Sequence, residues 1–285
     1  MAGPRKDEAP RIGVALGTIG ATPKWWLESA IRLDVAGYRA LWSWDHFVGG
    51  GDRTVPVVEQ WTILAAAAGA TKRIGLGTFI SNVMNRHPAV LARMASTLQE
   101  ASGGRLTLGI GIGGGPKEHV AYGIDFPAVD QRVRRLEDAV AVIRALWTGG
   151  PVTRDGAFYS LDDAYARPVL DLAPKILIGA AAPRGIRLAA RIGDGWAAEQ
   201  PDFEKHLGLY RDSLEAAGKR RAMAWIAVGV GGTGKSGQDN LRDSPWITSP
   251  VAEWLRWFEA GADEVIVTAR TKADVDALVT ARDRW

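Results

Sequence analysis

The 285-residue sequence predicts an α/β fold, a (β/α)8 TIM barrel formed by a single domain with insertions on its carboxyl-terminal face. Short apolar runs rich in β-branched residues alternate with longer stretches whose apolar residues recur about every 3.6 positions, which is the pattern of parallel βα units. Eight such units average roughly 34 residues each, a size typical of this barrel. No linker divides the chain, so we expect a disordered leader at 1–10 and one barrel domain at 11–285.

Each expected strand is a short buried run, and an amphipathic stretch of helical length follows it. We expect strands at 12–17, 40–44, 74–79, 106–110, 175–178, 195–198, 224–230 and 264–268. We expect helices at 24–36, 59–70, 89–101, 130–147, 185–191, 203–217, 251–260 and 272–281. Prolines such as Pro23 and Pro88 stand where a first-turn proline is tolerated, and Gly37 and Gly261 stand where a left-handed terminating residue is common.

Two segments exceed the repeat. Residues 149–174 follow the fourth helix and residues 231–245 follow the seventh strand, and we expect both on the carboxyl-terminal face, where barrel loops form the active site. The G-x-x-x-x-G-K-S pattern at 229–236 is not followed by a helix, which argues against a nucleotide-triphosphatase loop. The G-x-G-x-x-G pattern at 109–114 fits either a tight glycine turn or backbone N–H groups that bind an anion.

Composition excludes several classes of function. The chain has no cysteine, which excludes disulfides, thiolate metal sites and cysteine nucleophiles. The four histidines lack metal-ligand spacing, so we expect no metal, and a net charge of +3 does not indicate nucleic-acid binding. No apolar run approaches the roughly 20 residues that cross a bilayer. We therefore expect a soluble, cytoplasmic protein that acts on a small molecule, without a nucleic-acid or membrane partner.

The candidate catalytic residues lie in the sequence WDHF at 44–47, directly after the second expected strand. Asp45 and His46 are expected to point into the carboxyl-terminal mouth, where an imidazole beside a carboxylate can move a proton or bind substrate. The alternative is that His46 only fixes a loop. We expect His87 to cap a helix, and His119 and His206 to face solvent. Of the twelve tryptophans, Trp44 and Trp246 are the candidate walls of a substrate site.

Three segments of the sequence form a distinctive set: WSWDHF at 42–47, RIGLGTFISNVMNRHPAVLARMASTLQEASGGRLTLGIGIG at 73–113, and ILIGAAAPRGIRLAARIGDGW at 176–196. Together they resemble the bacterial luciferase-like flavin and deazaflavin oxidoreductases. The resemblance covers nearly the whole chain from Arg11. It implies a TIM barrel that holds the cofactor ring in its carboxyl-terminal mouth. In the deazaflavin branch it also implies a non-proline cis peptide behind the ring, which the motif places at Phe79–Ile80.

The resemblance further implies that His46 is the catalytic residue at the reacting face of the ring. The residues it implies for cofactor binding surround the mouth at strand ends: Asp45, Phe79, Ile80, Gly113, Lys117, Glu118, Gly179, Ala180, Ala181 and Arg184. The loop GAAAPRG at 179–185 offers Arg184 but no hydroxyl group for an FMN phosphate. Coenzyme F420 is therefore the expected cofactor, with FMN as the alternative.

We therefore expect an F420-dependent oxidoreductase that transfers hydride between the deazaflavin and a small organic substrate. An FMN-dependent monooxygenase and a non-catalytic flavin- or F420-binding protein are the alternatives. Glucose-6-phosphate dehydrogenases of this branch carry a tryptophan and a glutamate where this chain has Gly50 and Gly114, which argues against a sugar-phosphate substrate. Aromatic residues favour interfaces, so the twelve tryptophans are compatible with a homodimer.

Overall fold

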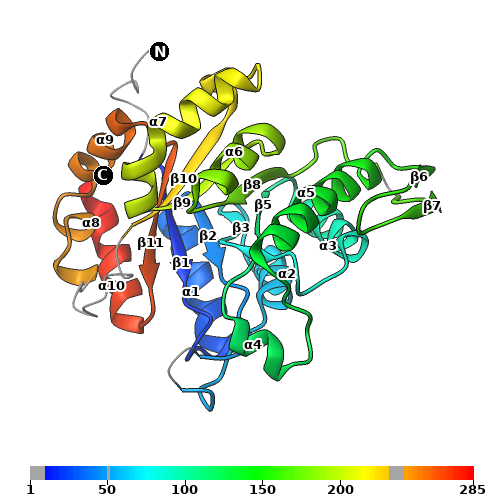
Figure 1. The fold of residues 1–285 in the computed structure, drawn as a ribbon. Helices are drawn as coiled ribbons and strands as arrows, with labels where there is room; N and C mark the ends of the chain where they lie inside the picture. The colour runs from blue at the N-terminus through cyan, green and yellow to red at the C-terminus, as the bar shows by residue number, and fades with distance from the viewer. Residues whose placement is uncertain (1–9, 50–51, 168, 231–240) are drawn as a thin grey trace.

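The computed structural model describes residues 10–49, 52–167, 169–230 and 241–285. Eight parallel strands form a ring in the order β3-β2-β1-β11-β10-β9-β8-β5, and β3 pairs with β5 to close it (Figure 1). Helices surround this ring on its outside (Figure 1). The expectation of a TIM barrel is confirmed.

The barrel strands are β1 (Ile12–Leu16), β2 (Ala40–Ser43), β3 (Gly75–Thr78), β5 (Leu106–Gly111), β8 (Lys175–Gly179), β9 (Gly195–Glu199), β10 (Trp225–Val230) and β11 (Glu264–Ala269). The helices that follow them are α1 (Pro23–Ala36), α2 (Gln60–Ala70), α3 (Pro88–Ala101), α5 (Val129–Leu146), α6 (Pro183–Ile192), α7 (Gln200–Ala216), α9 (Pro250–Ala260) and α10 (Lys272–Ala281). Every strand and helix expected from the sequence is present, with ends that differ by a few residues.

Several short elements were not expected from the sequence pattern. They are β4 (Ser81–Asn82), α4 (Pro116–Ala121), α8 (Pro245–Thr248) and the 3-10 turns η1 (Arg221–Met223), η2 (Leu241–Asp243) and η3 (Arg282–Arg284). β4 extends the sheet by pairing with the end of β5, and α4 lies in the connection between β5 and α5. Elements this short contain too few residues for hydrophobic periodicity to reveal them.

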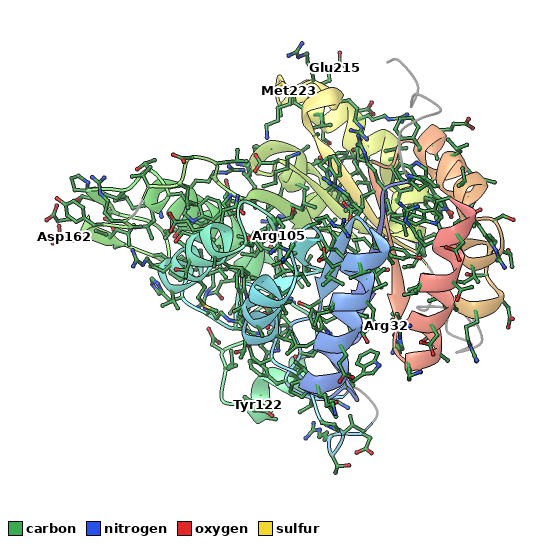
Figure 2. All side chains as sticks on the ribbon, turned by 180° about the vertical axis from the view of Figure 1, so that it is seen from behind. Arg32, Arg105, Tyr122, Asp162, Glu215 and Met223 are labelled. Atoms are coloured by element: carbon green, nitrogen blue, oxygen red, sulfur yellow. The ribbon has the colours of Figure 1, made fainter. Side chains whose placement is uncertain are left out.

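The insertion at 149–174 does not lie on the carboxyl-terminal face, contrary to the expectation. It connects the end of α5 to the start of β8, so both of its ends lie on the amino-terminal side of the barrel. It contains an antiparallel hairpin of β6 (Val152–Arg154) and β7 (Leu161–Ala164), which projects beyond α3 and α5 (Figure 1). The Asp138 carboxylate of α5 accepts hydrogen bonds from the backbone N–H groups of Phe158 at 2.8 Å and Tyr159 at 3.0 Å. Asp162, in β7, lies at the outer edge of the molecule (Figure 2).

Some of the expected features fall on residues outside the described ranges. These are the leader at 1–10 apart from its last residue, the position of Gly50, and residues 231–240 of the segment after β10, which contain most of the G-x-x-x-x-G-K-S pattern. The boundaries of the domain therefore stay a prediction. Within the described ranges, no helix combines the length and apolar character that crossing a membrane requires.

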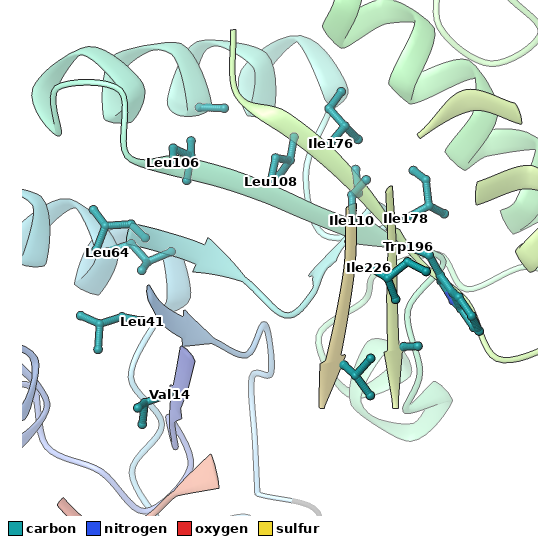
Figure 3. Close-up of a cluster of buried hydrophobic side chains, with 14 of the residues drawn as sticks. Val14, Leu41, Leu64, Leu106, Leu108, Ile110, Ile176, Ile178, Trp196 and Ile226 are labelled. Carbon is teal, nitrogen blue, oxygen red and sulfur yellow. The ribbon is translucent and has the colours of Figure 1, made fainter. Parts of the chain in front are cut away.

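The alternation of side chains along the strands produces two separate cores. Outward-facing residues such as Val14, Leu41 and Leu108 pack against the helices (Figure 3). The buried inward-facing set is Ala15, Ala40, Trp42, Leu177, Ala197, Ala227 and Ile266. Glycines near the carboxyl-terminal ends of β8 and β10, Gly179 and Gly229, line the cavities at that end of the barrel.

The Trp42 side chain fills the barrel interior toward its amino-terminal end. Its Nε1–H donates a hydrogen bond of 2.8 Å to the buried carboxyl group of Glu264, at the start of β11. A Cβ atom at Gly13 would lie 2.5 Å from both Nε1 of Trp42 and Oε1 of Glu264, and one at Gly77 would overlap the Trp42 ring. Glycine on β1 and β3 therefore makes room for the indole, which closes the barrel below the mouth.

Candidate active site

Two adjoining cavities open at the carboxyl-terminal ends of the strands. The larger has a volume of about 490 Å³ and lies between the segments that follow β2, β3, β5 and β8. The smaller has a volume of about 300 Å³ and lies over the ends of β1, β10 and β11. Trp44, His46, Phe79 and Glu199 line both cavities and so divide the mouth into two parts.

Asp45 is buried at the edge of the larger cavity, and its carboxylate oxygens are already hydrogen-bonded. They accept bonds from the Arg86 guanidinium at 2.7 and 3.0 Å and from the Asn82 backbone N–H at 2.9 Å. Arg86 also donates to Glu59 at 2.7 Å. Burial lowers the pKa of Arg86, but the bonds and charges of Asp45 and Glu59 outweigh this effect and raise it. The ion pair therefore joins the segments that follow β2 and β3.

The segment that carries His46 contacts Glu118, a buried residue in the first turn of α4. The Glu118 carboxylate accepts hydrogen bonds from the backbone N–H groups of Phe47 at 3.1 Å and Val48 at 3.3 Å. Its Oε2 atom also lies 3.4 Å from Nδ1 of His46, whose side chain is 46% exposed. Glu118 thus fixes the segment after β2 and turns Nδ1 of the imidazole toward itself.

The peptide bond between Phe79 and Ile80 is cis, as the resemblance implied. The Phe79 ring faces the barrel interior and makes an edge contact with Trp42, with ring centroids 6.0 Å apart. Ile80 extends into the larger cavity, where a Cβ atom at Gly111 or Gly179 would overlap its side chain. Glycine at the ends of β5 and β8 therefore accommodates the Ile80 side chain.

The glycine-rich segment after β5 lines the larger cavity with backbone. Gly113 has a φ of +74°, and a Cβ atom there would overlap the Asn82 amide group. A Cβ atom at Gly114 would meet no atom within 4 Å, so this position opens onto the cavity. The positive φ of Gly113 fits the tight glycine turn, and the open position at Gly114 leaves backbone facing the cavity. Both interpretations of the 109–114 pattern, a glycine turn and a backbone anion site, therefore fit this geometry.

The amino-terminal end of α6 forms the opposite wall of the larger cavity. Ala180, Ala181, Arg184 and Gly185 line it there, together with Gly179 at the end of β8. The first turn of a helix presents unpaired backbone N–H groups and a partial positive charge, which favour an anionic group. Arg184 adds a cationic side chain, although it is also paired with Asp130.

The fold agrees with comparisons to known proteins. A family model described as luciferase-like monooxygenase matches residues 9–234. The chain belongs to the luciferase-like monooxygenase family. It is 34% identical over 209 residues to the F420-dependent glucose-6-phosphate dehydrogenase of Amycolatopsis mediterranei, covering 71% of this chain and 60% of that protein. It is 30% identical over 203 residues to the F420-dependent hydroxymycolic acid dehydrogenase of Mycobacterium tuberculosis, covering 68% and 56%.

The chain thus spans little more than half the length of these curated relatives. Among solved structures, an F420-dependent secondary alcohol dehydrogenase in complex with an F420–acetone adduct superposes with a TM-score of 0.80 at 22% identity, covering 96% of this chain and 98% of that one. The coenzyme F420-dependent tetrahydromethanopterin reductase of Methanopyrus kandleri has a TM-score of 0.75 at 17% identity, covering 97% and 98%. At these identities the structures establish the luciferase-like fold alone.

Most of the expected site residues line the mouth of this luciferase-like barrel, but Lys117 does not. Lys117 is exposed and lines a shallow groove outside the larger cavity, together with Arg53. Trp44 lines both cavities, as expected of a wall residue. Trp246 does not line either of them: it is buried on α8 in the outer core, so its interpretation as a wall was wrong.

His87 and His119, outside the mouth, have structural roles. His87 caps α3 by accepting a hydrogen bond from the Ala89 backbone N–H at 3.2 Å, as expected. His119 is fully buried, contrary to the expectation that it faces solvent. Its Nε2 atom lies 2.6 Å from the Asn82 side-chain nitrogen and its Nδ1 atom 3.0 Å from the Gly115 carbonyl oxygen. The expectation failed because α4, which carries His119, was not foreseen. His206 on α7 is partly buried.

The sequence analysis did not identify two residues of the site, Arg86 behind Asp45 and Glu199 in the mouth. Arg86 lies in the segment between β4 and α3, and its pairing with Asp45 spans 41 positions of the chain. Glu199 ends β9, and burial together with the charge of Asp202 raises its pKa to about 7. An acidic residue directly after an expected strand is the signal that singled out Asp45, and it applies equally to Glu199.

Proposed function

We propose that this protein is a coenzyme F420-dependent oxidoreductase that transfers hydride between the deazaflavin and a small organic substrate. The cavity of about 490 Å³ at the carboxyl-terminal mouth, which has mainly apolar walls, His46 and the amino-terminal end of α6 with Arg184, is the observation that carries the proposal. The relatives from Amycolatopsis mediterranei and Mycobacterium tuberculosis are F420-dependent dehydrogenases, which supports the choice of F420. The missing hydroxyl group in residues 179–185 argues against FMN.

The larger cavity fits such a cofactor. A Cβ atom at Gly114 would point into open space, so the segment after β5 leaves room for an extended ligand. Ile80, Val133 and Leu188 offer apolar surface to a ring system. We assign the phosphate of the cofactor to the amino-terminal end of α6 and Arg184, because these groups favour an anion.

When bound, F420 supplies a ring carbon that accepts or donates hydride. The residues of this chain position the reactants and handle the accompanying proton. We assign the proton to His46: its Nδ1 atom faces Glu118, which leaves Nε2 to accept or donate a proton in the cavities that the imidazole lines. Its partial exposure allows that proton to exchange with solvent.

A cofactor titration tests the proposal. F420 added to the purified protein is expected to bind at least about tenfold more tightly than FMN, which corresponds to about 1.4 kcal/mol. Retained FMN with reductase-dependent oxygen consumption would instead identify an FMN-dependent monooxygenase. Binding of F420 without turnover of any alcohol or ketone would identify a non-catalytic binding protein.

A His46→Asn variant tests the catalytic assignment separately. It is expected to bind F420 as the wild type does but to lose turnover, and full turnover would remove His46 from the mechanism.

The homodimer and the cytoplasmic location stay predictions. Light scattering checks the first of these against the 30.6 kDa mass of the single chain.

A further inference from the structure

The smaller cavity contains an ionisable group that the proposed function does not use. Glu199 lines it from the end of β9, opposite the segment after β2 that carries His46. A Cβ atom at Gly229 would lie 2.9 Å from Oε2 of Glu199 and 3.0 Å from the Phe79 ring. Glycine at 229 therefore lets the carboxyl group and the aromatic ring lie side by side on the wall of the cavity.

The carboxyl group of Glu199 is available to a ligand. α7 begins directly after it, yet the side chain does not cap that helix. Within the described part of the chain, no residue hydrogen-bonds to the Glu199 carboxyl oxygens or forms an ion pair with them. Burial and the negative charge of Asp202 both favour the protonated form. A neutral carboxylic acid in a cavity can donate a hydrogen bond, which a carboxylate cannot.

Apart from His46 and Arg270, the rest of the smaller cavity suits a small uncharged molecule. Ala15, Ile19, Trp44, Phe79 and Ile266 provide apolar walls, and Thr268 adds a hydroxyl group. Resting on the proposed function, we propose that Glu199 acts in its protonated form as a catalytic residue that donates a hydrogen bond to the oxygen of a small ketone or alcohol substrate. His46 then exchanges the proton of that oxygen, while Glu199 keeps its own proton and polarises the bond to carbon.

Other charged groups face the mouth and must be separated from Glu199 in any pH experiment. Arg270 lines the smaller cavity, with its guanidinium 5.1 Å from the Trp44 ring centroid. The groups around the larger cavity are Asp45, His46, Glu118, Arg184 and Asp202. His46 also lines the smaller cavity and can exchange a proton, so it requires a variant of its own.

The test measures binding of cyclohexanone to the cofactor-free protein by ligand-observed NMR at pH 6 and pH 8. With a pKa of about 7, the protonated fraction of Glu199 falls from about nine tenths to about one tenth between these values, so the affinity is expected to fall about tenfold. Glu199→Gln keeps a donor and is expected to bind equally at both pH values. Glu199→Leu removes the donor and is expected to bind weakly at both. Glu215→Gln, on the exposed end of α7 (Figure 2), is the control and is expected to behave as the wild type does.

The outcomes separate this proposal from the proposed function. A pH dependence that persists in Glu199→Gln but disappears in His46→Asn would overturn the role of Glu199. So would a wild type that does not bind cyclohexanone at pH 6, or that binds it equally at both pH values. An F420 titration is run on the same samples. Failure to bind F420, with the pH dependence of cyclohexanone binding intact, would contradict the proposed function and leave Glu199 as a ligand-binding acid.

Discussion

The free energy of unfolding is expected to depend on pH through the Glu264 carboxyl group, and replacing Glu264 with glutamine is expected to remove this dependence. Glu264 is buried at the closed end of the barrel, where it accepts the hydrogen bond of Trp42. Burial raises its pKa from 4.5 to about 7, although the bond to Trp42 and the charges of Arg39 and Arg11 oppose that rise. Glutamine has nearly the same volume and keeps an oxygen for Trp42, so the substitution removes ionisation and little else.

The sign and size follow from the two pKa values. Below pH 4.5 the folded and unfolded chains both hold the proton, and its contribution to stability is fully present. As the pH rises toward 7 the unfolded chain ionises while the folded chain keeps the proton, so the free energy of unfolding falls. Between pH 5 and pH 8 the fall is about 2–3 kcal/mol for a folded pKa of about 7.

Urea unfolding of the wild type and Glu264→Gln at pH 5 and pH 8 measures this effect. The wild type is expected to lose about 2–3 kcal/mol relative to the variant between the two pH values. Other titrating groups, Glu199 among them, are present in both proteins and cancel in the comparison. Glu215→Gln controls for loss of a surface charge. A difference between wild type and Glu264→Gln that is the same at both pH values would refute the reasoning.

Three further substitutions test other contacts. Asp45→Ala leaves the partly buried Arg86 guanidinium without one of its two carboxylate partners and is expected to cost about 2–4 kcal/mol of unfolding free energy; a loss under about 1 kcal/mol by urea titration would show that Glu59 alone is a sufficient partner for Arg86. Gly77→Ala forces a methyl group into the Trp42 ring and is expected to cost about 1–3 kcal/mol and change the near-ultraviolet circular dichroism, whereas an unchanged spectrum would contradict the packing. Glu118→Gln weakens the acceptor for the segment after β2 and is expected to lower kcat/KM about tenfold, with a stability loss of only about 1 kcal/mol; unaltered kinetics would argue against its positioning role.

The barrel could be predicted from the sequence because each of its elements carries a local signal. A strand such as β11 is a continuous buried run, and a helix such as α10 has a threonine cap at Thr271 and apolar residues at helical spacing. The position of Asp45 and His46 also follows from local order, since residues after barrel strands lie at the mouth. The cis bond at Phe79–Ile80 came from the resemblance alone.

What could not be predicted depends on contacts between distant parts of the chain. The bonds of Arg86 to Asp45 and Glu59 leave no periodic pattern, and neither does the burial that perturbs Glu199. The position of the insertion at 149–174 was predicted wrongly for a different reason. A segment that follows a barrel helix and precedes the next strand lies on the amino-terminal side of the barrel. The prediction relied instead on the turn-rich composition of the insertion, which is also typical of loops on the carboxyl-terminal side. Lys117 was assigned by motif, but its position on the exposed side of α4 depends on a helix that the pattern did not reveal.

The β6–β7 hairpin offers a site at which a label or a surface linker can be coupled to the protein. Its strand β7 carries the exposed Asp162 at the outer edge of the molecule, and Asp162 is not among the residues that line the mouth (Figure 2). Because the sequence has no cysteine, an Asp162→Cys variant would carry one thiol. A fluorophore or a surface linker coupled to that thiol would leave the barrel mouth accessible, which allows immobilised or single-molecule assays of the same protein.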